Sequence, residues 1–234
     1  AGAASADIMG WTGQGLLGYS GVSGNSESSS LNAAVDLGKT YGKWSHAFGV
    51  DAFFSESKAD KDSDKESTAE RYGADYKANY AFNKHDYVFG TVAYQKDLFG
   101  GVNEKWLEAI GYGRRIIDLP AHTLNGEVGI GARQETSQPD PVTGVETKNN
   151  EAVGLIGAKY NWAFSKTGNF YQNLSTEIGS DNTYGESVTG VNAKLSDVMS
   201  LGASYTVKHN SGIQGDFGKH SDKYTAINLT YAIK

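Results

Sequence analysis

The sequence predicts an all-β fold: a single antiparallel up-and-down transmembrane β-barrel of about 12 strands, with short periplasmic turns and longer extracellular loops. Polar and apolar residues alternate over segments of about a dozen residues, the period of a strand with two different faces. The connections between these segments are alternately short and long. The chain also has 30 Gly and 14 Tyr but only 3 Pro among 234 residues, and its Gly and aromatic residues are interleaved as in strands.

The strand segments differ in how clearly they alternate. The clearest is 71–82, where Tyr72 and Tyr76 fall on one face and Asp75 and Lys77 on the other. No segment reaches the roughly 18 consecutive apolar residues of a membrane-spanning helix. The same alternation predicts, in chain order, strands at 31–38, 124–135, 201–209 and 227–233, and less regular strands of open register at 88–98 and 105–117.

The connections separate by length into two sets. An even number of strands places both termini beside the short turns, which in bacterial outer-membrane barrels face the periplasm. We therefore expect the bacterial outer membrane as the location, with both termini periplasmic. The predicted short turns are at 42–43, 83–85, 119–121, 165–168 and 197–198, and the longest loops are at 57–67, 138–149 and 211–223.

Composition and the first residues fit an exported protein. The chain has no Cys, which excludes disulfide scaffolds and thiolate metal sites. Its net charge of −6 argues against nucleic-acid binding, and no motif calls for a cofactor. Residues 1–7 have the small-residue character of a signal-peptide cleavage region. We expect them to be a residual tail, with residues 8–234 forming one barrel domain.

Aromatic residues cluster near the predicted strand ends. Trp and Tyr combine an apolar body with a polar tip and settle at membrane–water interfaces, so the expected partners are outer-membrane lipid and lipopolysaccharide. A soluble β-sandwich or lipocalin-like barrel is the alternative, but its strands are typically about 5–6 residues long. The predicted aromatic girdle at the periplasmic end is Trp11, Trp44, Tyr80, Phe82, Trp162, Phe164 and Tyr231.

Alternation also predicts which charged side chains line the lumen. Acids and bases are nearly balanced in this set, so two functions stay open. One is a narrow hydrated pathway for small polar or ionic solutes; the other is a closed barrel braced by ion pairs, with a role in surface binding or envelope integrity. The predicted lumen-lining residues are Asp36, Asp51, Arg71, Asp75, Lys77, Glu108, Arg114, Glu127, Arg133, Glu135, Lys159, Glu177, Glu186, Lys194 and Lys208.

Enzymatic and metal-binding functions find little support. A surface hydrolase could use His209 or His220 beside the Ser and Asp residues of the last loop, Ser211, Asp216, Ser221 and Asp222, but such a composition arises easily in a polar loop. His46, His85 and His122 fall near the predicted periplasmic ends. Asp60, Asp62 and Asp64 resemble the first ligands of a calcium loop, yet Lys65 stands where Gly is needed. We predict no catalytic residues, and no metal site beyond that weak candidate.

Several motifs resemble one family. The opening segments 11–15 and 22–26, the central Gly-Tyr-Gly-Arg-Arg at 111–115, and the last hairpin at 207–211 and 219–225 are similar to the YdiY-like salt-induced outer-membrane proteins (domain of unknown function 481). The resemblance implies an outer-membrane barrel inserted by the barrel-assembly machinery, without enzymatic activity and linked to salt or envelope stress. Outer-membrane barrels usually end in an aromatic residue recognised during assembly, whereas this sequence ends Tyr231-Ala-Ile-Lys234. Either Tyr231 serves that role or assembly tolerates the difference.

Overall fold

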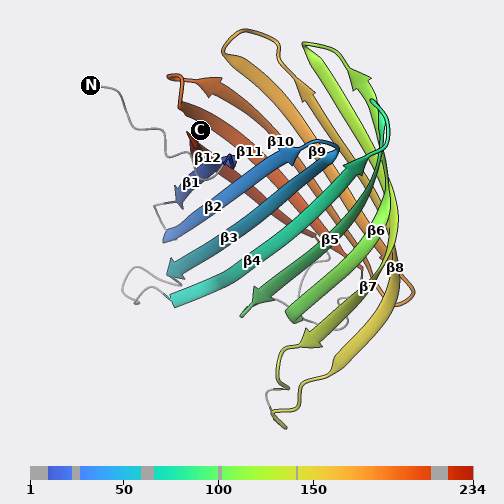
Figure 1. The fold of residues 1–234 in the computed structure, drawn as a ribbon. Helices are drawn as coiled ribbons and strands as arrows, with labels where there is room; N and C mark the ends of the chain where they lie inside the picture. The colour runs from blue at the N-terminus through green and yellow to red at the C-terminus, as the bar shows by residue number, and fades with distance from the viewer. Residues whose placement is uncertain are drawn as a thin grey trace.

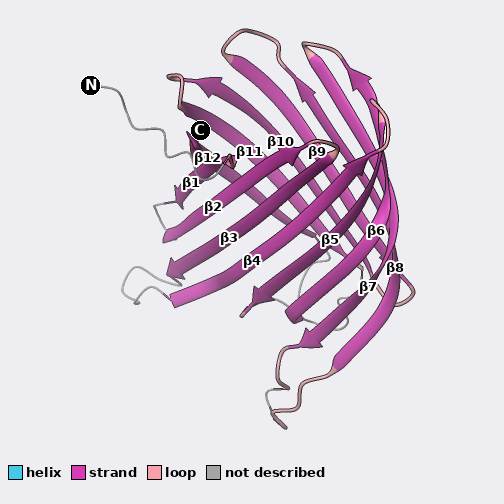
Figure 2. Cartoon of the chain, viewed as in Figure 1, coloured by secondary structure: helices cyan, strands magenta, loops and turns pink. Residues whose placement is uncertain are grey.

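Twelve antiparallel strands pair in chain order, and β12 pairs with β1, so that the sheet closes into a barrel (Figures 1 and 2). The computed structural model describes residues 10–22, 27–58, 66–99, 102–140, 142–211 and 221–233; the predicted tail, residues 1–7, lies outside them. The strands are β1 (Thr12–Val22), β2 (Glu27–Tyr41), β3 (Trp44–Lys58), β4 (Glu66–Ala81), β5 (Asp86–Asp97), β6 (Val102–Asp118), β7 (His122–Ser137), β8 (Lys148–Trp162), β9 (Gly168–Gly179), β10 (Thr183–Lys194), β11 (Met199–Asn210) and β12 (Ser221–Ile233).

Closure is made by β1, which bonds to both of its neighbours in the ring. Leu17 of β1 lies opposite Ala33 of β2 and opposite Leu229 of β12. The strands range from 11 residues in β1 to 17 in β6, well above the roughly 5–6 residues of an ordinary strand. A closed sheet leaves no edge strand with unpaired backbone groups. The predicted fold class is therefore confirmed.

The period of two is visible in β4. Tyr72 and Tyr76 are 39% and 41% exposed on the outer surface, whereas Lys77 points inward and reaches Glu127 of β7. Successive side chains of a strand point to opposite faces, so this contact fixes the inner face of both strands. Paired residues on neighbouring strands share a face, and the register carries the assignment around the ring.

The two segments of open register differ in the structure: β5, which covers most of 88–98, pairs regularly with both neighbours, whereas β6, which covers 105–117, contains two irregularities. Its pairing with β7 shifts by one residue between Val102 and Glu104 and again between Arg115 and Ile117. A bulge adds one residue to one strand and moves the following side chains to the other face. The apolar and polar residues of this segment therefore cannot follow a single alternation from end to end.

The connections fall at two ends of the barrel, here called the short-turn end and the long-loop end. The short-turn end carries 42–43, 82–85, 119–121, 163–167 and 195–198, and both described chain ends lie there. The tightest turn has Gly42 with φ +57°, a conformation that suits glycine. At the long-loop end, 138–147 spans ten residues, but 180–182 spans only three. The prediction that the longest connections share one end is confirmed.

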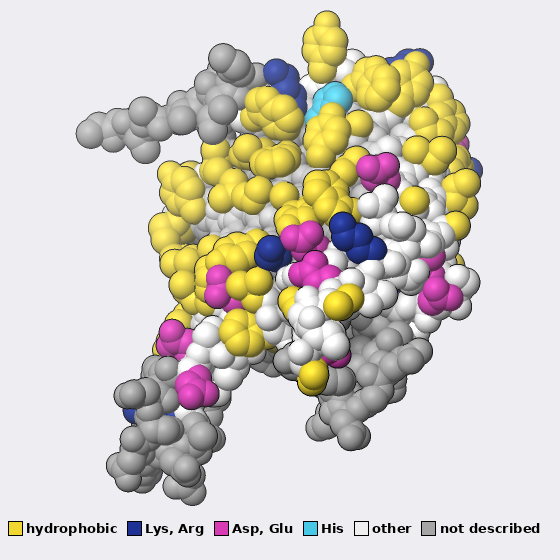
Figure 3. All heavy atoms as spheres, turned by 90° about the horizontal axis from the view of Figure 1, so that it is seen from below, with side chains coloured by type: hydrophobic (Ala, Val, Ile, Leu, Met, Phe, Trp, Pro, Cys, Tyr) yellow, Lys and Arg dark blue, Asp and Glu magenta, His cyan; other side chains and the backbone are white. Residues whose placement is uncertain are grey.

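The outer surface of the barrel is apolar between its two ends. Ile110 and Ile130 are 67% and 70% exposed there, and Figure 3 shows hydrophobic side chains spread widely over the visible surface. A contiguous apolar surface of this kind is covered by lipid or by protein in a stable molecule. The described part of the chain contains no helix long and apolar enough to span a membrane.

Aromatic side chains gather at both ends of this apolar surface. At the short-turn end Trp44 packs on Tyr80, with 5.0 Å between ring centroids, and Trp162 packs on Phe164 at 5.7 Å. At the long-loop end the rings of Tyr94 and Trp106 are 4.6 Å apart. The remaining predicted girdle residues also lie toward the short-turn end: Trp11, Phe82 and Tyr231.

Candidate functional site

The barrel lumen holds most of the charged residues predicted for it. The register and the cross-lumen contacts place these side chains on the inner faces of their strands, where balanced charges can pair in a low-dielectric interior. Lys194 lies at the short-turn rim, exposed at the end of β10. The inward-facing set is Asp36, Asp51, Arg71, Asp75, Lys77, Glu127, Arg133, Glu135, Lys159, Glu177, Glu186, Lys194 and Lys208.

Two predicted lumen residues face outward instead. Glu108 pairs with Val92 of β5 and Ala132 of β7, and all three belong to the exposed outer face. Between its two bulges β6 alternates regularly, and Glu108 shares the outer face with Trp106 and Ile110. Arg114 is also outside, 58% exposed by side chain, with Nη1 3.1 Å from Asp86 Oδ1.

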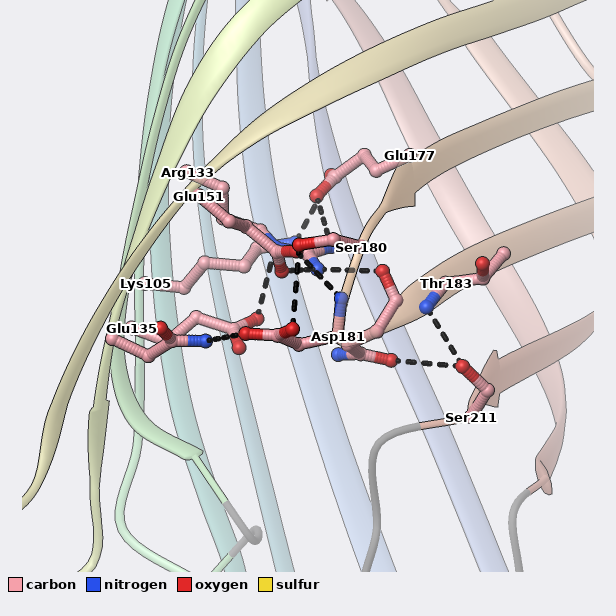
Figure 4. Close-up of polar contacts among 11 residues, drawn as sticks. Lys105, Arg133, Glu135, Glu151, Glu177, Ser180, Asp181, Thr183 and Ser211 are labelled. Atoms are coloured by element: carbon pink, nitrogen blue, oxygen red, sulfur yellow. Dashed lines mark hydrogen bonds and ion pairs between the residues drawn. The ribbon is translucent and has the colours of Figure 1, made fainter.

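Arg133 is the most buried large side chain of the described residues, with 0% exposure. Its Nη1 lies 3.2 Å from Glu177 Oε2, and its Nη2 contacts Glu151 and donates to the Asn182 carbonyl at 2.8 Å (Figure 4). Its Nε is 3.3 Å from Glu135 Oε1, close enough for an ion pair but without hydrogen-bond geometry. Such a guanidinium needs several carboxylates, because an unpaired buried charge is costly.

Lys105 completes what we call the Arg133 network: Lys105, Arg133, Glu135, Glu151 and Glu177. Lys105 Nζ lies 3.1 Å from Glu177 Oε1, so this carboxylate bridges two cations. The five residues come from four consecutive strands, β6 to β9 (Figure 4). The network fills this side of the lumen near the long-loop end.

The three-residue connection 180–182 is attached to this network. The Asp181 amide donates to Glu151 Oε2 at 3.1 Å. Ser211 donates from Oγ to Asn182 Oδ1 at 3.3 Å and accepts from the Thr183 amide at 2.7 Å (Figure 4). The connection therefore covers the network from the long-loop side.

Two smaller ion pairs brace other parts of the lumen. Lys77 Nζ lies 2.5 Å from Glu127 Oε1, the Tyr87 hydroxyl donates to the same oxygen at 2.8 Å, and Lys77 stands 4.2 Å from the centre of the Phe89 ring. Cations over aromatic faces gain further attraction. The second pair is Lys208 with Glu186, at 3.0 Å between Nζ and Oε2.

The wall formed by β2, β3 and β4 is open by comparison. Asp36, Asp51 and Asp75 are exposed although they face inward, as is Lys159 across the lumen. Two internal cavities, of about 140 Å³ and 300 Å³, both touch Asp51. Exposed carboxylates beside two cavities that share Asp51 indicate a hydrated strip along one side of the barrel.

Sequence reasoning missed several aromatic residues of the lumen. Phe53 faces inward beside Tyr224, with 5.6 Å between their ring centroids. Tyr87 also faces the lumen, where its hydroxyl donates to Glu127. The strand alternation could have identified Phe53 as a lumen residue, because it is two residues from Asp51 and therefore shares its face. Nothing in the sequence marks Asn182, whose backbone carbonyl accepts the hydrogen bond from Arg133.

One contact of the predicted hydrolase site is present in the structure. His209 Nδ1 lies 3.0 Å from Ser221 Oγ, while Ser211 is engaged with Thr183 and Asn182. Asp216, His220 and the Asp222 side chain lie outside the described residues. At the short-turn end, His46 and His122 each contact a tyrosine hydroxyl, at 2.7 Å and 2.8 Å.

Metal ligands do not assemble in the described part of the chain, where no group of three His, Cys, Asp or Glu could hold an ion. The weak calcium candidate, Asp60, Asp62 and Asp64, lies outside that part. Calcium binding by these three residues therefore stays a prediction.

Comparison with known sequences identifies a family and a relative of this chain. The family described as "Protein of unknown function, DUF481" matches residues 16–233. "Uncharacterized protein YdiY" of Escherichia coli (strain K12) is 25% identical over 221 residues, covering 92% of this chain and 81% of that protein. Its similarity extends over nearly the whole barrel.

Solved structures give the same fold at low sequence identity. A NanC porin has a TM-score of 0.56 at 6% identity, over 94% of this chain and 99% of that one. The COG4313 outer membrane channel from Pseudomonas putida F1 has a TM-score of 0.56 at 9% identity, over 95% and 94%. The translocator domain of the autotransporter NalP from Neisseria meningitidis has 0.51 at 12%, over 94% and 87%.

Proposed function

This chain belongs to the DUF481 family, and we propose that it is an outer-membrane β-barrel acting as a narrow channel for small ions and polar solutes. Support for the membrane comes from the apolar outer surface, on which Ile110 and Ile130 are exposed, and from aromatic pairs at both of its ends. Transmembrane barrels carry such an apolar band between two aromatic girdles.

The proposed orientation follows from the connections. We assign the short-turn end, with both termini, to the periplasm, and the long-loop end to the cell surface beside lipopolysaccharide. Insertion by the barrel-assembly machinery belongs to this proposal. The link to salt or envelope stress, implied by the resemblance, stays a prediction.

The observation that carries the channel function is the asymmetry of the lumen. One side is filled by the Arg133 network, whereas the β2–β4 wall exposes Asp36, Asp51 and Asp75 to the interior. Solutes would pass along this wall, through the cavities that meet at Asp51. Rings or rows of carboxylates favour cations in pores, so the channel would prefer small cations.

Planar-bilayer recording tests the proposal. The purified protein is expected to give stepwise currents with a reversal potential, in a KCl gradient, that favours K⁺. Asp51→Asn and Asp75→Asn should each lower this cation preference. Glu108→Gln removes a carboxylate from the outer surface and should leave the reversal potential unchanged. Selectivity unchanged in both lumen variants would contradict the assigned pathway.

A closed barrel is the second candidate, and the Arg133 network favours it. Three strands, β7 to β9, and the connection 180–182 meet around one fully buried guanidinium, which would brace a barrel that serves surface binding or envelope integrity. A protein that inserts but gives no current at any salt concentration would support this function over the channel.

A further inference from the structure

A cavity of about 300 Å³ lies inside the barrel, between β2–β4 and β11–β12. Its charged lining comes from Asp51, Arg71, Lys208 and Lys223, and its aromatic lining from the Phe53–Tyr224 pair. On another side, Asn228 donates to Ser204 Oγ at 2.8 Å and Asn32 to Asn228 Oδ1 at 3.5 Å. The cavity thus combines charge, amide and hydroxyl groups, and an aromatic wall, as ligand sites do.

The charged residues of this cavity differ in their ion-pair partners. Lys208 is neutralised by Glu186, which also accepts a hydrogen bond from Tyr184 at 3.3 Å. Within the described residues, neither Arg71 nor Asp51 has an opposite charge within 4 Å (the described ion pairs involve other residues). Lys223 is opposite Val207, on the face of the sheet that points away from the lumen. The interior of the cavity therefore offers one cation, Arg71, and one anion, Asp51, that the described part of the barrel leaves without an ion pair.

Packing rather than a carboxylate holds Arg71 in place. Its guanidinium carbon lies 5.4 Å from the centre of the Phe53 ring, and Phe53 is its direct cross-strand partner. This contact leaves the N–H donors of the guanidinium for another acceptor, and these donors match a carboxylate in a bidentate manner.

Asp51 stands at a fixed distance from Arg71 along the sheet. Asp51 pairs with Gly73, two residues from Arg71 on β4, so the two are diagonal neighbours whose Cα atoms are about 7–8 Å apart. A small molecule with opposite charges a few atoms apart can contact both. A molecule with only a negative charge would be repelled by Asp51, and a molecule with only a positive charge would be repelled by Arg71.

We propose that this cavity is a binding subsite for a small zwitterion, whose carboxylate is bound by Arg71 and whose ammonium group is bound by Asp51. The inference rests on the proposed channel, because the subsite lies on its pathway. Binding at such a point is weak enough to release the solute again.

The test compares three molecules of similar size: L-alanine, propionate and isopropylammonium. Saturation-transfer NMR on the folded, detergent-solubilised protein at pH 7 measures binding without requiring conductance. We expect transfer to alanine at least about tenfold above that to the other two, the factor worth one charge-assisted contact. Equal transfer to propionate or to isopropylammonium, or no transfer to alanine, would overturn the proposal.

Variants then test the assigned residues. Arg71→Gln and Asp51→Asn should each reduce transfer to alanine several-fold, whereas Arg114→Gln and Glu108→Gln, matched changes on the outer surface, should not. Undiminished transfer in both lumen variants would overturn the assignment. If a lumen variant fails to fold, the three-ligand comparison on the unchanged protein still decides.

The outcome separates the subsite from the channel. Currents without transfer to alanine would refute the subsite and leave the channel, whereas transfer without currents would refute the channel and leave a binding cavity in a closed barrel.

Discussion

Arg133 of β7 and Glu177 of β9 form an ion pair across the inner face of β8, with 3.2 Å between Nη1 and Oε2. Backbone hydrogen bonds join only adjacent strands, so this contact adds a link between strands that are not paired. Glu151 of β8 contacts the same guanidinium. Side chains thereby fix the curvature of three consecutive strands at the long-loop end.

Removal of this guanidinium should destabilise the barrel strongly. Arg133→Met leaves Glu135, Glu151 and Glu177 without their shared cation, and breaking a buried pair in this way typically costs about 3–5 kcal/mol. The measurement is urea unfolding in detergent or lipid, followed by tryptophan fluorescence. Arg114→Gln is the control, because a largely exposed ion pair contributes little to the free energy of unfolding. A similar small loss for both variants would show that the Arg133 network is hydrated rather than buried.

The Lys77–Glu127 pair should show a measurable coupling between β4 and β7. These strands are not neighbours in the sheet, so the two side chains interact only through the lumen. Lys77→Met, Glu127→Gln and the double variant form a cycle, and we expect a coupling of about 1–3 kcal/mol in the free energy of unfolding. Additive effects would mean that water separates the two groups.

The architecture could be predicted from the sequence because two regularities determine it: polar and apolar residues alternate along each strand, and short and long connections alternate along the chain. From Arg71 to Tyr80 of β4 the tyrosines and the charged residues lie on opposite faces, so the strand, its faces and its place in a barrel follow directly. The inward positions of Arg133 and Glu177 follow in the same way. Which of these charges pair could not be predicted, since pairing across the lumen depends on strand order, tilt and curvature.

Local irregularities set the limit of that reasoning. The shifts at Val102/Glu104 and Arg115/Ile117 leave no composition signal, and Glu108 was assigned to the lumen from the alternation of a segment whose two faces are both mixed. Asn182 binds Arg133 through its backbone carbonyl, which any residue could supply. Such features depend on backbone geometry rather than on residue type.

Replacing Glu108 should stabilise the barrel in lipid. Its carboxylate lies on the apolar outer surface between Val92 and Ala132, where a charged side chain faces hydrocarbon if the proposed membrane location holds. Charged residues on this face cost up to about 2–4 kcal/mol for Lys or Arg at the midplane and less for Asp or Glu. We expect Glu108→Leu to raise the free energy of unfolding by about 1 kcal/mol in vesicles. Destabilisation would indicate that Glu108 has a protein partner on this face.

Asp140 should make the loop 138–147 sensitive to acid. Its Oδ1 accepts hydrogen bonds from the Thr143 amide at 2.7 Å, the Thr143 hydroxyl at 2.9 Å and the Val142 amide at 3.0 Å. These hydrogen bonds lower the pKa of Asp140 below its ordinary value, and the bond from the Thr143 amide has the largest effect. The stabilisation of the turn is therefore complete above the unfolded pKa of about 4 and is lost as the pH falls through the lower folded pKa.

Amide hydrogen exchange, corrected for the intrinsic pH dependence of exchange, measures this effect at Val142 and Thr143. Their protection should be constant from neutral pH down to about 4 and should fall below that. In Asp140→Asn, whose amide oxygen still accepts hydrogen bonds but does not titrate, the acid-dependent loss should disappear. Asp140→Ala should lack the protection at every pH, because the acceptor itself is gone. An acid-dependent loss that persists in Asp140→Asn would assign the titration to another group of the loop.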